Sequence, residues 1–148
     1  MRQPHEALVF LHRQGAGRRE VLVLHRVPDD YWHGLAGGLE DEETAAEAAL
    51  REVAEEAGLD VRETLFATGH GYVYELPVDP VLTTHFPAGT AIEITCFEAE
   101  VPPGTEPVLN DEHDLHRWCS FAEADALLRW EDTREALRLL GERLGARA

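Results

Sequence analysis

The chain has 148 residues, 44% of them apolar, which suits one ordinary hydrophobic core and predicts a single domain over residues 1–148. Its 13 basic and 29 acidic residues give a net charge of −16, a field that repels the backbone of a nucleic-acid polymer and excludes it as a favourable partner. No apolar run approaches the roughly 20 residues of a membrane span and the start lacks a secretory signal, so we expect a cytoplasmic protein without a membrane partner.

Short aliphatic runs predict β-strands along the chain. Residues 6–12 and 20–26 flank a glycine-rich turn and predict a hairpin. Further strands are expected at 64–68, 72–76, 91–101 and 115–121. Segments 77–89 and 102–114, rich in proline, glycine and acids, predict loops. The two cysteines, Cys96 and Cys119, fall in expected strands and are interpreted as packing residues.

Three helices are expected between and after these strands. The first follows Thr44, which forms a capping-box pattern with Glu47, and ends at Gly58. The second follows Ser120 and runs to about residue 129, and the third begins near Asp132, each with a glutamate three residues after its cap. This order predicts an α+β fold in which a mixed sheet is covered by helices on both faces.

The first helix carries three acids that converge. At about 100° per residue, Glu52, Glu55 and Glu56 share one face, beside the stripe of alanine, valine and leucine that faces the core. Such carboxylates repel one another, and Mg²⁺ or Mn²⁺ would resolve that repulsion because hard cations prefer oxygen ligands and share them with phosphates. Divalent cations would also offset the repulsion between this acidic chain and a small polyphosphate.

Residues just before and beside this face would support it. Arg51 is placed to pair with Glu43, which precedes the helix, or with one of the metal-binding glutamates. Residues 37–43 supply a glycine-containing turn that lets the backbone approach metal or phosphate.

The spacing of these residues resembles a known family motif in full. Gly37, five residues, Glu43, seven residues, Arg51-Glu52-Val53, one residue, Glu55-Glu56, one residue and Gly58-Leu59 match the Nudix box. The pattern fixes nine positions across 23 residues, far more than a lone glycine motif does. The resemblance implies the Nudix α/β/α sandwich, with the box helix and the C-terminal helices flanking the sheet. It also implies a pyrophosphohydrolase that acts on a nucleoside diphosphate linked to another group.

The resemblance also implies roles for the box residues. The implied metal ligands, with Mg²⁺ as the cofactor and Mn²⁺ as a substitute, are Glu52, Glu55, Glu56 and the carbonyl of Gly37. Glu43 and Arg51 would give structural and electrostatic support. Water would attack phosphorus, with metal lowering the pKa of that water and neutralising the leaving phosphate.

A second segment resembles part of several Nudix subfamilies. Residues 112–118 carry the pattern E-H-x-x-x-x-W, and in those subfamilies an acid near this loop is an additional metal ligand or the general base. We therefore include Glu112 among the expected catalytic residues.

Together with residues 31–40 and 127–137, the chain looks most like bacterial Nudix enzymes that act on dihydroneopterin triphosphate or (deoxy)nucleoside triphosphates. The candidates for contact with this small-molecule substrate are Arg26, Trp32, His33 and Phe86, the aromatic ones as stacking partners for a flat ring. We expect a monomer or a homodimer.

Three alternatives stay open. A diadenosine-polyphosphate hydrolase usually has a P-K-G run before the box glutamate, whereas this chain has Leu35-Ala-Gly-Gly38 and no lysine. ADP-ribose hydrolases share an A-G-x-x-E turn but often add an N-terminal dimerisation segment. A non-catalytic, nucleotide-sensing Nudix module tends to lose box acids, and none is lost here.

Overall fold

The computed structural model describes residues 2–27, 29–76 and 86–147 of the chain. Within these ranges the elements follow one another in the order β1 (Arg2–Gln14), β2 (Arg19–Arg26), β3 (Tyr31–His33), β4 (Leu35–Glu40), α1 (Ala45–Ala57), β5 (Leu65–Glu75), β6 (Ala91–Glu100), β7 (His113–Cys119), α2 (Phe121–Leu127) and α3 (Glu131–Arg147). The part of the first expected loop at 77–85 lies outside the described residues. The second expected loop, 102–114, is a loop as far as residue 112, where β7 follows.

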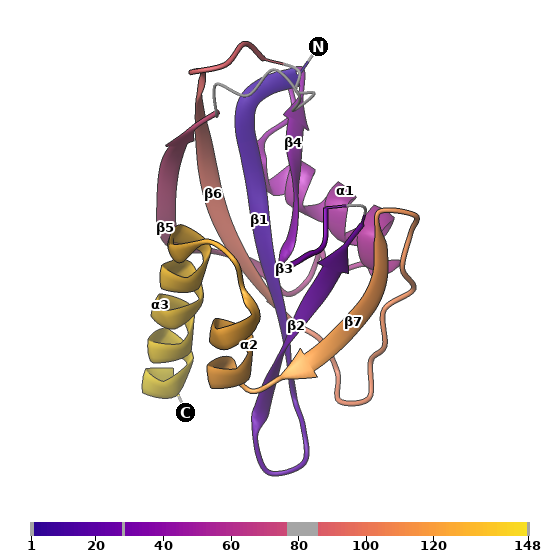
Figure 1. Ribbon diagram of the computed structural model, residues 1–148. Helices are drawn as coiled ribbons and strands as arrows, with labels where there is room; N and C mark the ends of the chain where they lie inside the picture. The colour runs from indigo at the N-terminus through magenta and orange to yellow at the C-terminus, as the bar shows by residue number, and fades with distance from the viewer. Residues whose placement is uncertain (1, 28, 77–85, 148) are drawn as a thin grey trace.

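The described strands form one mixed sheet in the order β3-β2-β1-β6-β5, with β4 also paired to β1 and β7 also paired to β2. Strand β1 runs parallel to β6, from His5 opposite Glu93 to His12 opposite Glu100. On its other side β1 pairs antiparallel with β4 up to Val9 and with β2 from His12 onward. The long first strand therefore joins the two halves of the sheet, as Figure 1 shows.

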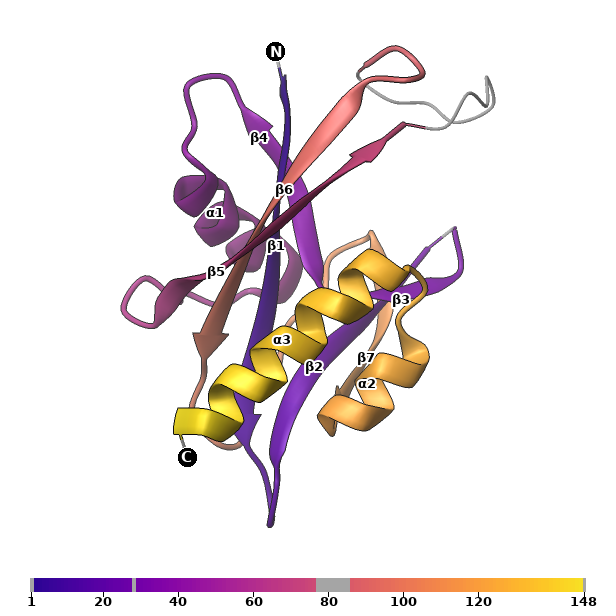
Figure 2. The same cartoon turned by 90° about the vertical axis from the view of Figure 1, so that its left-hand side faces the viewer.

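Helix α1 covers one face of this sheet, and α2 and α3 cover the other (Figures 1 and 2). Successive side chains of a strand point to opposite faces of the sheet, so each strand contributes to the core on both sides. In β1, Val9 and Leu11 pack in the cluster under α1, whereas Leu8 and Phe10 pack in the cluster under α2 and α3. The predicted fold, an α+β sandwich with helices on both faces, is confirmed.

The helix ends follow the predicted capping chemistry at two of three sites. Thr44 and Glu47 form the expected box at α1, and Gly58 ends this helix with φ 66°, a left-handed conformation that suits glycine. Ser120 caps α2 in the same way. The predicted cap at Asp132 was wrong: α3 begins at Glu131, and the first helical bond runs from the Arg134 N–H to the carbonyl oxygen of Trp130.

The strands differ from the sequence prediction in several places. Strand β1 begins at Arg2, before the predicted residue 6, β3 was not predicted, and β7 covers His113–Cys119 where 115–121 was predicted. Segments 64–68 and 72–76 belong to one strand, β5, because the register shift between Ala67 and Gly71 bends the chain without ending its pairing with β6. Part of the expected flexible turn at 37–43 is strand β4, since Gly37 and Gly38 pair with Ala7 and Glu6 of β1. Backbone pairing to a buried neighbour outweighs the low strand propensity of glycine there.

Both cysteines are free and buried, which confirms their assignment as packing residues. No helix among the described residues is both long enough and apolar enough to cross a membrane.

Candidate active site

Strand β4 and helix α1 hold Glu56 in the interior. The side chain is only 1% exposed, and one carboxylate oxygen accepts a hydrogen bond from the backbone N–H of Ala36 at 3.0 Å. The other oxygen, Oε2, is buried and accepts no hydrogen bond from the described residues. A buried carboxylate oxygen without a donor is costly, so this oxygen suits a bound cation or a proton.

His113, the first residue of β7, and Glu112, which precedes it, face this carboxylate. Nε2 of His113 lies 3.9 Å from Oε2 of Glu56, and both side chains are almost completely buried. Ligand atoms of Glu56, Glu112 and His113 all lie within 4.8 Å of one another. We call these three residues the metal group. The sequence prediction included Glu56 and Glu112 but did not assign His113 to this position.

Electrostatics in the metal group favour a bound cation. Burial raises the pKa of Glu56 to about 9, and the negative charges of Glu52 and Glu112 add to this rise. Burial lowers the pKa of His113, which leaves the imidazole neutral and able to donate a lone pair. Two carboxylates and a neutral imidazole suit a divalent cation, so the residues present fit the metal that the sequence motif implies.

Arg51 organises the remaining acids of α1. Its Nε and Nη2 donate to the two carboxylate oxygens of Glu43, each at 2.9 Å, which is the expected pair in bidentate form. Nη2 also donates to the carbonyl oxygen of Gly38, and Nη1 donates to Glu52 at 2.7 Å and to Glu55 at 3.4 Å. The hydrogen bonds to Glu43 and Glu52 raise the pKa of Arg51, and the bond to Gly38 ties the helix to β4.

The three box acids of α1 differ in their surroundings. Glu52 is buried beside Gly37, where a Cβ on the glycine would collide with its carboxylate. Burial raises the pKa of Glu52, and the Arg51 guanidinium opposes part of that rise. Glu55 is largely exposed. Glu52 and Glu56 therefore line the interior between α1 and β4, while Glu55 lies at its solvent edge.

The predicted substrate contacts differ in burial and in their neighbours. Arg26 is partly exposed at the end of β2, with its guanidinium 3.5 Å from Glu112 and 3.6 Å from Asp29. His33 has a buried Nδ1, and burial lowers its pKa to about 4. Trp32 and Phe86 are partly buried and pack on the core beneath α2 and α3.

Two further aromatic residues beside this region were not among the predicted contacts. Tyr31 and Trp130 pack edge to face, with ring centroids 4.6 Å apart. Trp130 is 45% exposed. It follows α2 by three residues, within the segment 127–137 that contributes to the family resemblance, but the sequence did not mark it as a substrate contact, and only long-range packing reveals its position next to β3.

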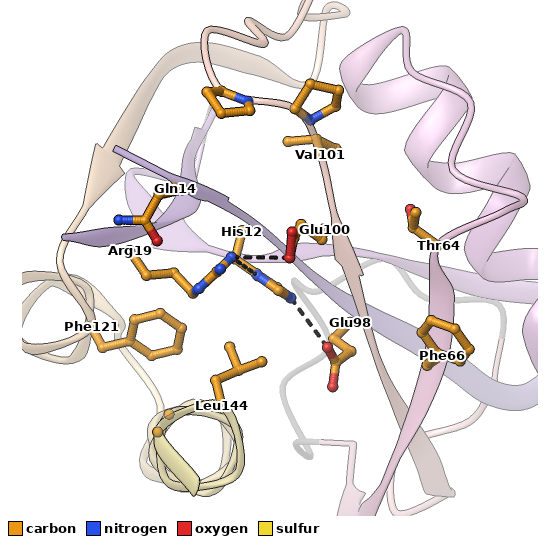
Figure 3. Close-up of a pocket in the computed structure, with 14 residues that line it drawn as sticks. His12, Gln14, Arg19, Thr64, Phe66, Glu98, Glu100, Val101, Phe121 and Leu144 are labelled. Atoms are coloured by element: carbon orange, nitrogen blue, oxygen red, sulfur yellow. Dashed lines mark hydrogen bonds and ion pairs between the residues drawn. The ribbon is translucent and has the colours of Figure 1, made fainter. Parts of the chain in front are cut away.

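A hollow of about 1110 Å³ lies elsewhere, between the lower ends of β1, β2 and β6 and the C-terminal part of α3 (Figure 3). His12 and Glu98 form its floor and are joined by a hydrogen bond of 3.2 Å, while Phe66 stands on one side and Phe121 and Leu144 on the other. None of the metal group lines it. The chemistry of the box acids therefore does not take place in this hollow.

Proteins of similar sequence or structure agree with the assignment that the geometry of the site suggests. The NUDIX domain model matches residues 2–140. Dihydroneopterin triphosphate diphosphatase of Escherichia coli K12 is 29% identical over 138 residues, 92% of this chain and 91% of that protein. The solved structure of the Escherichia coli dihydroneopterin triphosphate pyrophosphohydrolase has a TM-score of 0.74 at 28% identity and covers 92% of this chain and 93% of its own.

A NUDIX hydrolase from Listeria monocytogenes has a similar structure, with a TM-score of 0.81 at 31% identity, covering 98% of this chain and 97% of that one. The family model spans nearly the whole chain, and the complete box lies on a strand and helix that hold its acids beside one another. The chain therefore belongs to the Nudix hydrolase family.

Proposed function

We propose that the chain is a Mg²⁺-dependent pyrophosphohydrolase that cleaves a phosphoric anhydride of dihydroneopterin triphosphate or of a (deoxy)nucleoside triphosphate. The observation that carries this proposal is the carboxylate of Glu56, buried with one oxygen lacking a donor and facing Glu112 and His113. When bound, a divalent cation would lower the pKa of a coordinated water and offset charge on the leaving phosphate.

The chain's own residues have distinct tasks in this proposal. Glu56 would hold the cation within the metal group, and Glu52, Glu55 and the carbonyl of Gly37 would supply the further ligands that the box implies, with Mn²⁺ as a substitute for Mg²⁺. Arg51 fixes Glu52 and, through Glu43, the loop before the helix. These contacts set the positions of the ligands before a substrate arrives, which lowers the cost of ordering them during the reaction.

Glu112 takes the proton of the attacking water. Its side chain is 51% exposed, so it reaches solvent, and it lies in the metal group beside the buried Glu56. Attack by this water on phosphorus breaks the anhydride bond, and the leaving phosphate departs with the bonding electron pair. Arg26, held near Glu112, stabilises the negative charge on the phosphates.

Relatives support the choice of substrate. The Escherichia coli relative that aligns with 92% of this chain carries the name dihydroneopterin triphosphate diphosphatase. A flat ring attached to a triphosphate also suits the aromatic residues near β3, and Trp32, His33 and Phe86 remain the proposed contacts from the sequence. Hydrolysis of diadenosine polyphosphate or ADP-ribose is the alternative activity, and a non-catalytic sensor is the alternative class.

The test is a comparison of substrates and variants with Mg²⁺ and Mn²⁺. Catalytic efficiency is measured for dihydroneopterin triphosphate, the dNTPs, ADP-ribose and diadenosine tetraphosphate, with products identified by ion-exchange chromatography. We expect pyrophosphate and a monophosphate from the first two, and a loss of at least about tenfold in Glu56→Gln. Glu63→Gln, which changes an exposed glutamate after α1, is the matched control and should retain activity.

Two results would contradict the proposal in different ways. Strong preference for ADP-ribose or the dinucleotide would replace the substrate class and leave the reaction class standing. Equal inactivity of the wild type and Glu56→Gln across all substrates would remove the enzyme assignment.

A further inference from the structure

Three neighbouring strands place one residue each in a row that leads away from the metal group. Arg26 of β2 lies opposite His113 of β7 on one side and opposite Tyr31 of β3 on the other. Adjacent strands are about 4.8 Å apart, so Tyr31 lies roughly 10 Å from the position of His113 across the sheet. Arg26 stands between an aromatic residue and the metal group.

Trp130 completes an aromatic cluster at the far end of this row. Its ring meets Tyr31 at 4.6 Å and 74°, and meets His33 at 5.7 Å and 88°, both edge-on geometries. The backbone of this segment is fixed as well, because Leu128 forms a parallel bridge with Trp32 and the carbonyl of Trp130 starts α3. The indole is therefore held in a defined orientation.

The indole of Trp130 is nevertheless exposed to solvent. Trp130 is 45% exposed although its neighbours at the ring edges are partly or fully buried. The guanidinium of Arg129 lies over the same ring, 5.5 Å from its centroid. A large aromatic side chain that is fixed by its neighbours and still exposed is suited to bind a ligand.

The order of the groups matches the order of parts in the proposed substrate. A triphosphate attached to a flat heterocycle needs cations at one end and an aromatic surface at the other, separated by a few ångströms of sugar or side chain. The metal group, then Arg26, then the pair Tyr31 and Trp130 supply these in sequence. Stacking on an aromatic side chain accepts any flat ring, because every such ring has a π-face.

We infer that Trp130, supported by Tyr31, is the surface on which the planar pterin or purine ring of the substrate stacks, with Arg26 at the intervening phosphate. This inference rests on the proposed function, because it assumes that the substrate carries a flat ring next to its phosphates. It assigns specificity for the ring to a residue outside the Nudix box.

The first test separates binding of the ring from binding of the phosphates. KM and kcat are measured for dihydroneopterin triphosphate and dGTP with the wild type, Trp130→Ala and Trp130→Phe. Inorganic tripolyphosphate, which has no ring, serves as a competitive inhibitor. Trp130→Ala should raise KM at least about tenfold, a change that corresponds to the stacking contribution of one base, and leave the inhibition constant of tripolyphosphate unchanged. Trp130→Phe keeps an aromatic face and should stay within about threefold of the wild type.

The matched control is Phe66→Ala, which removes an aromatic side chain that is 57% exposed on β5 and lines the separate hollow. It should leave KM unchanged. Thermal denaturation of every variant shows whether a loss of binding reflects unfolding. If Trp130→Ala is folded and its KM for both ring-bearing substrates equals that of Phe66→Ala, the inference is wrong while the proposed function stands.

A binding measurement tests the inference without any hydrolysis of the ligand. Calorimetric titration of dGMP and of neopterin should show binding to the wild type and to Trp130→Phe, and binding at least about tenfold weaker to Trp130→Ala. Absence of binding to the wild type would overturn the inference. Binding that depends on Trp130 in a protein that hydrolyses no triphosphate would support the ring site and reject the proposed enzyme activity.

Discussion

The carboxylate of Glu52 fills the space that a side chain at position 37 would need. Gly37 lies in β4 and Glu52 in α1, so their approach brings the box strand and the box helix into direct contact. The requirement for glycine at this box position is steric, because even one methyl group would displace the carboxylate.

Gly37→Ala should therefore reduce activity more than it reduces stability. The colliding atoms belong to the end of a flexible glutamate, which can rotate away while the strand and helix stay in place. We expect a folded protein whose metal-dependent activity is at least about tenfold lower, because Glu52 leaves its position. Circular dichroism and steady-state kinetics measure both effects. Gly145→Ala, at a helical glycine with no neighbour within 4 Å of an added Cβ, is the control; activity of Gly37→Ala within twofold of this control would contradict the prediction.

The pair Arg51 and Glu43 should contribute measurably to folding. It is bidentate, and its side chains are only 22% and 14% exposed. A double-mutant cycle with Arg51→Ala and Glu43→Ala, followed by urea denaturation, should give a coupling energy of about 1–2 kcal/mol. The exposed pair Arg62 and Asp60 provides the comparison and should couple by less than about 1 kcal/mol. Equal coupling energies in the two cycles would show that the buried pair has no special role.

Glu56 should make the metal-free protein less stable as the pH rises. Its pKa is raised to about 9 in the fold, so the unfolded chain releases this proton at lower pH, and its free energy falls relative to that of the folded state between pH 4.5 and about 9. Glu56→Gln cannot lose a proton there. In chelating buffer at pH 8, the variant should melt at least about 3 °C above the wild type, and the difference should shrink at pH 5.

Addition of Mn²⁺ or Mg²⁺ at pH 8 should make the wild type melt above Glu56→Gln, since the cation replaces the proton on the wild-type carboxylate. Differential scanning calorimetry with and without the cation provides the measurement. A wild type that is more stable than Glu56→Gln at pH 8 without metal would show that the buried carboxylate is already compensated within the protein.

His12 should cause a separate loss of stability in acid. Arg19 can only donate, so Nδ1 of His12 accepts its hydrogen bond at 2.9 Å and Nε2 carries the proton donated to Glu98. This arrangement requires a neutral imidazole, and burial lowers the pKa of His12 accordingly. The unfolded chain takes up a proton as the pH falls below about 6.5, so the folded state loses stability in that range.

His12→Gln preserves one donor and one acceptor without a group that titrates there. Between pH 7.5 and pH 5, the wild type should lose about 1 kcal/mol more free energy of unfolding than this variant, as measured by urea denaturation at each pH. Hydrolysis at pH 7.5 should be unaffected, because the hollow lies apart from the metal group. Parallel pH profiles of the two proteins would refute the assigned tautomer.

The sequence was sufficient for features whose partners are near in the chain. The capping residues of α1 act within four positions, and the pairing of Arg51 with Glu43 spans eight, so local spacing predicts them. The β4 strand was missed because its formation depends on the exposed backbone groups of β1, about thirty residues earlier, and not on its own composition. Local pattern carries no information on that pairing.

Local sequence pattern also fails to predict most contacts within the candidate site. Helical spacing places Glu52, Glu55 and Glu56 on one face, but the packing of α1 against β4 decides which of them are buried. His113 meets Glu56 only because β7 pairs with β2 in a register that ends at Arg26. Trp130 reaches Tyr31 through the bridge between β3 and the segment before α3. Each of these contacts depends on tertiary register, which motif spacing does not encode.

The parallel pairing of β1 with β6 has a consequence for the folding pathway. Each residue of β1 from His5 to His12 finds its β6 partner 88 residues further along the chain. Closing such a long loop is entropically costly, and contacts of this separation form slowly. Strand β4 and helix α1 lie on the side of β1 away from β6, so they can assemble early as a local unit. We therefore expect the pairing of β1 with β6 to be among the slower steps of folding.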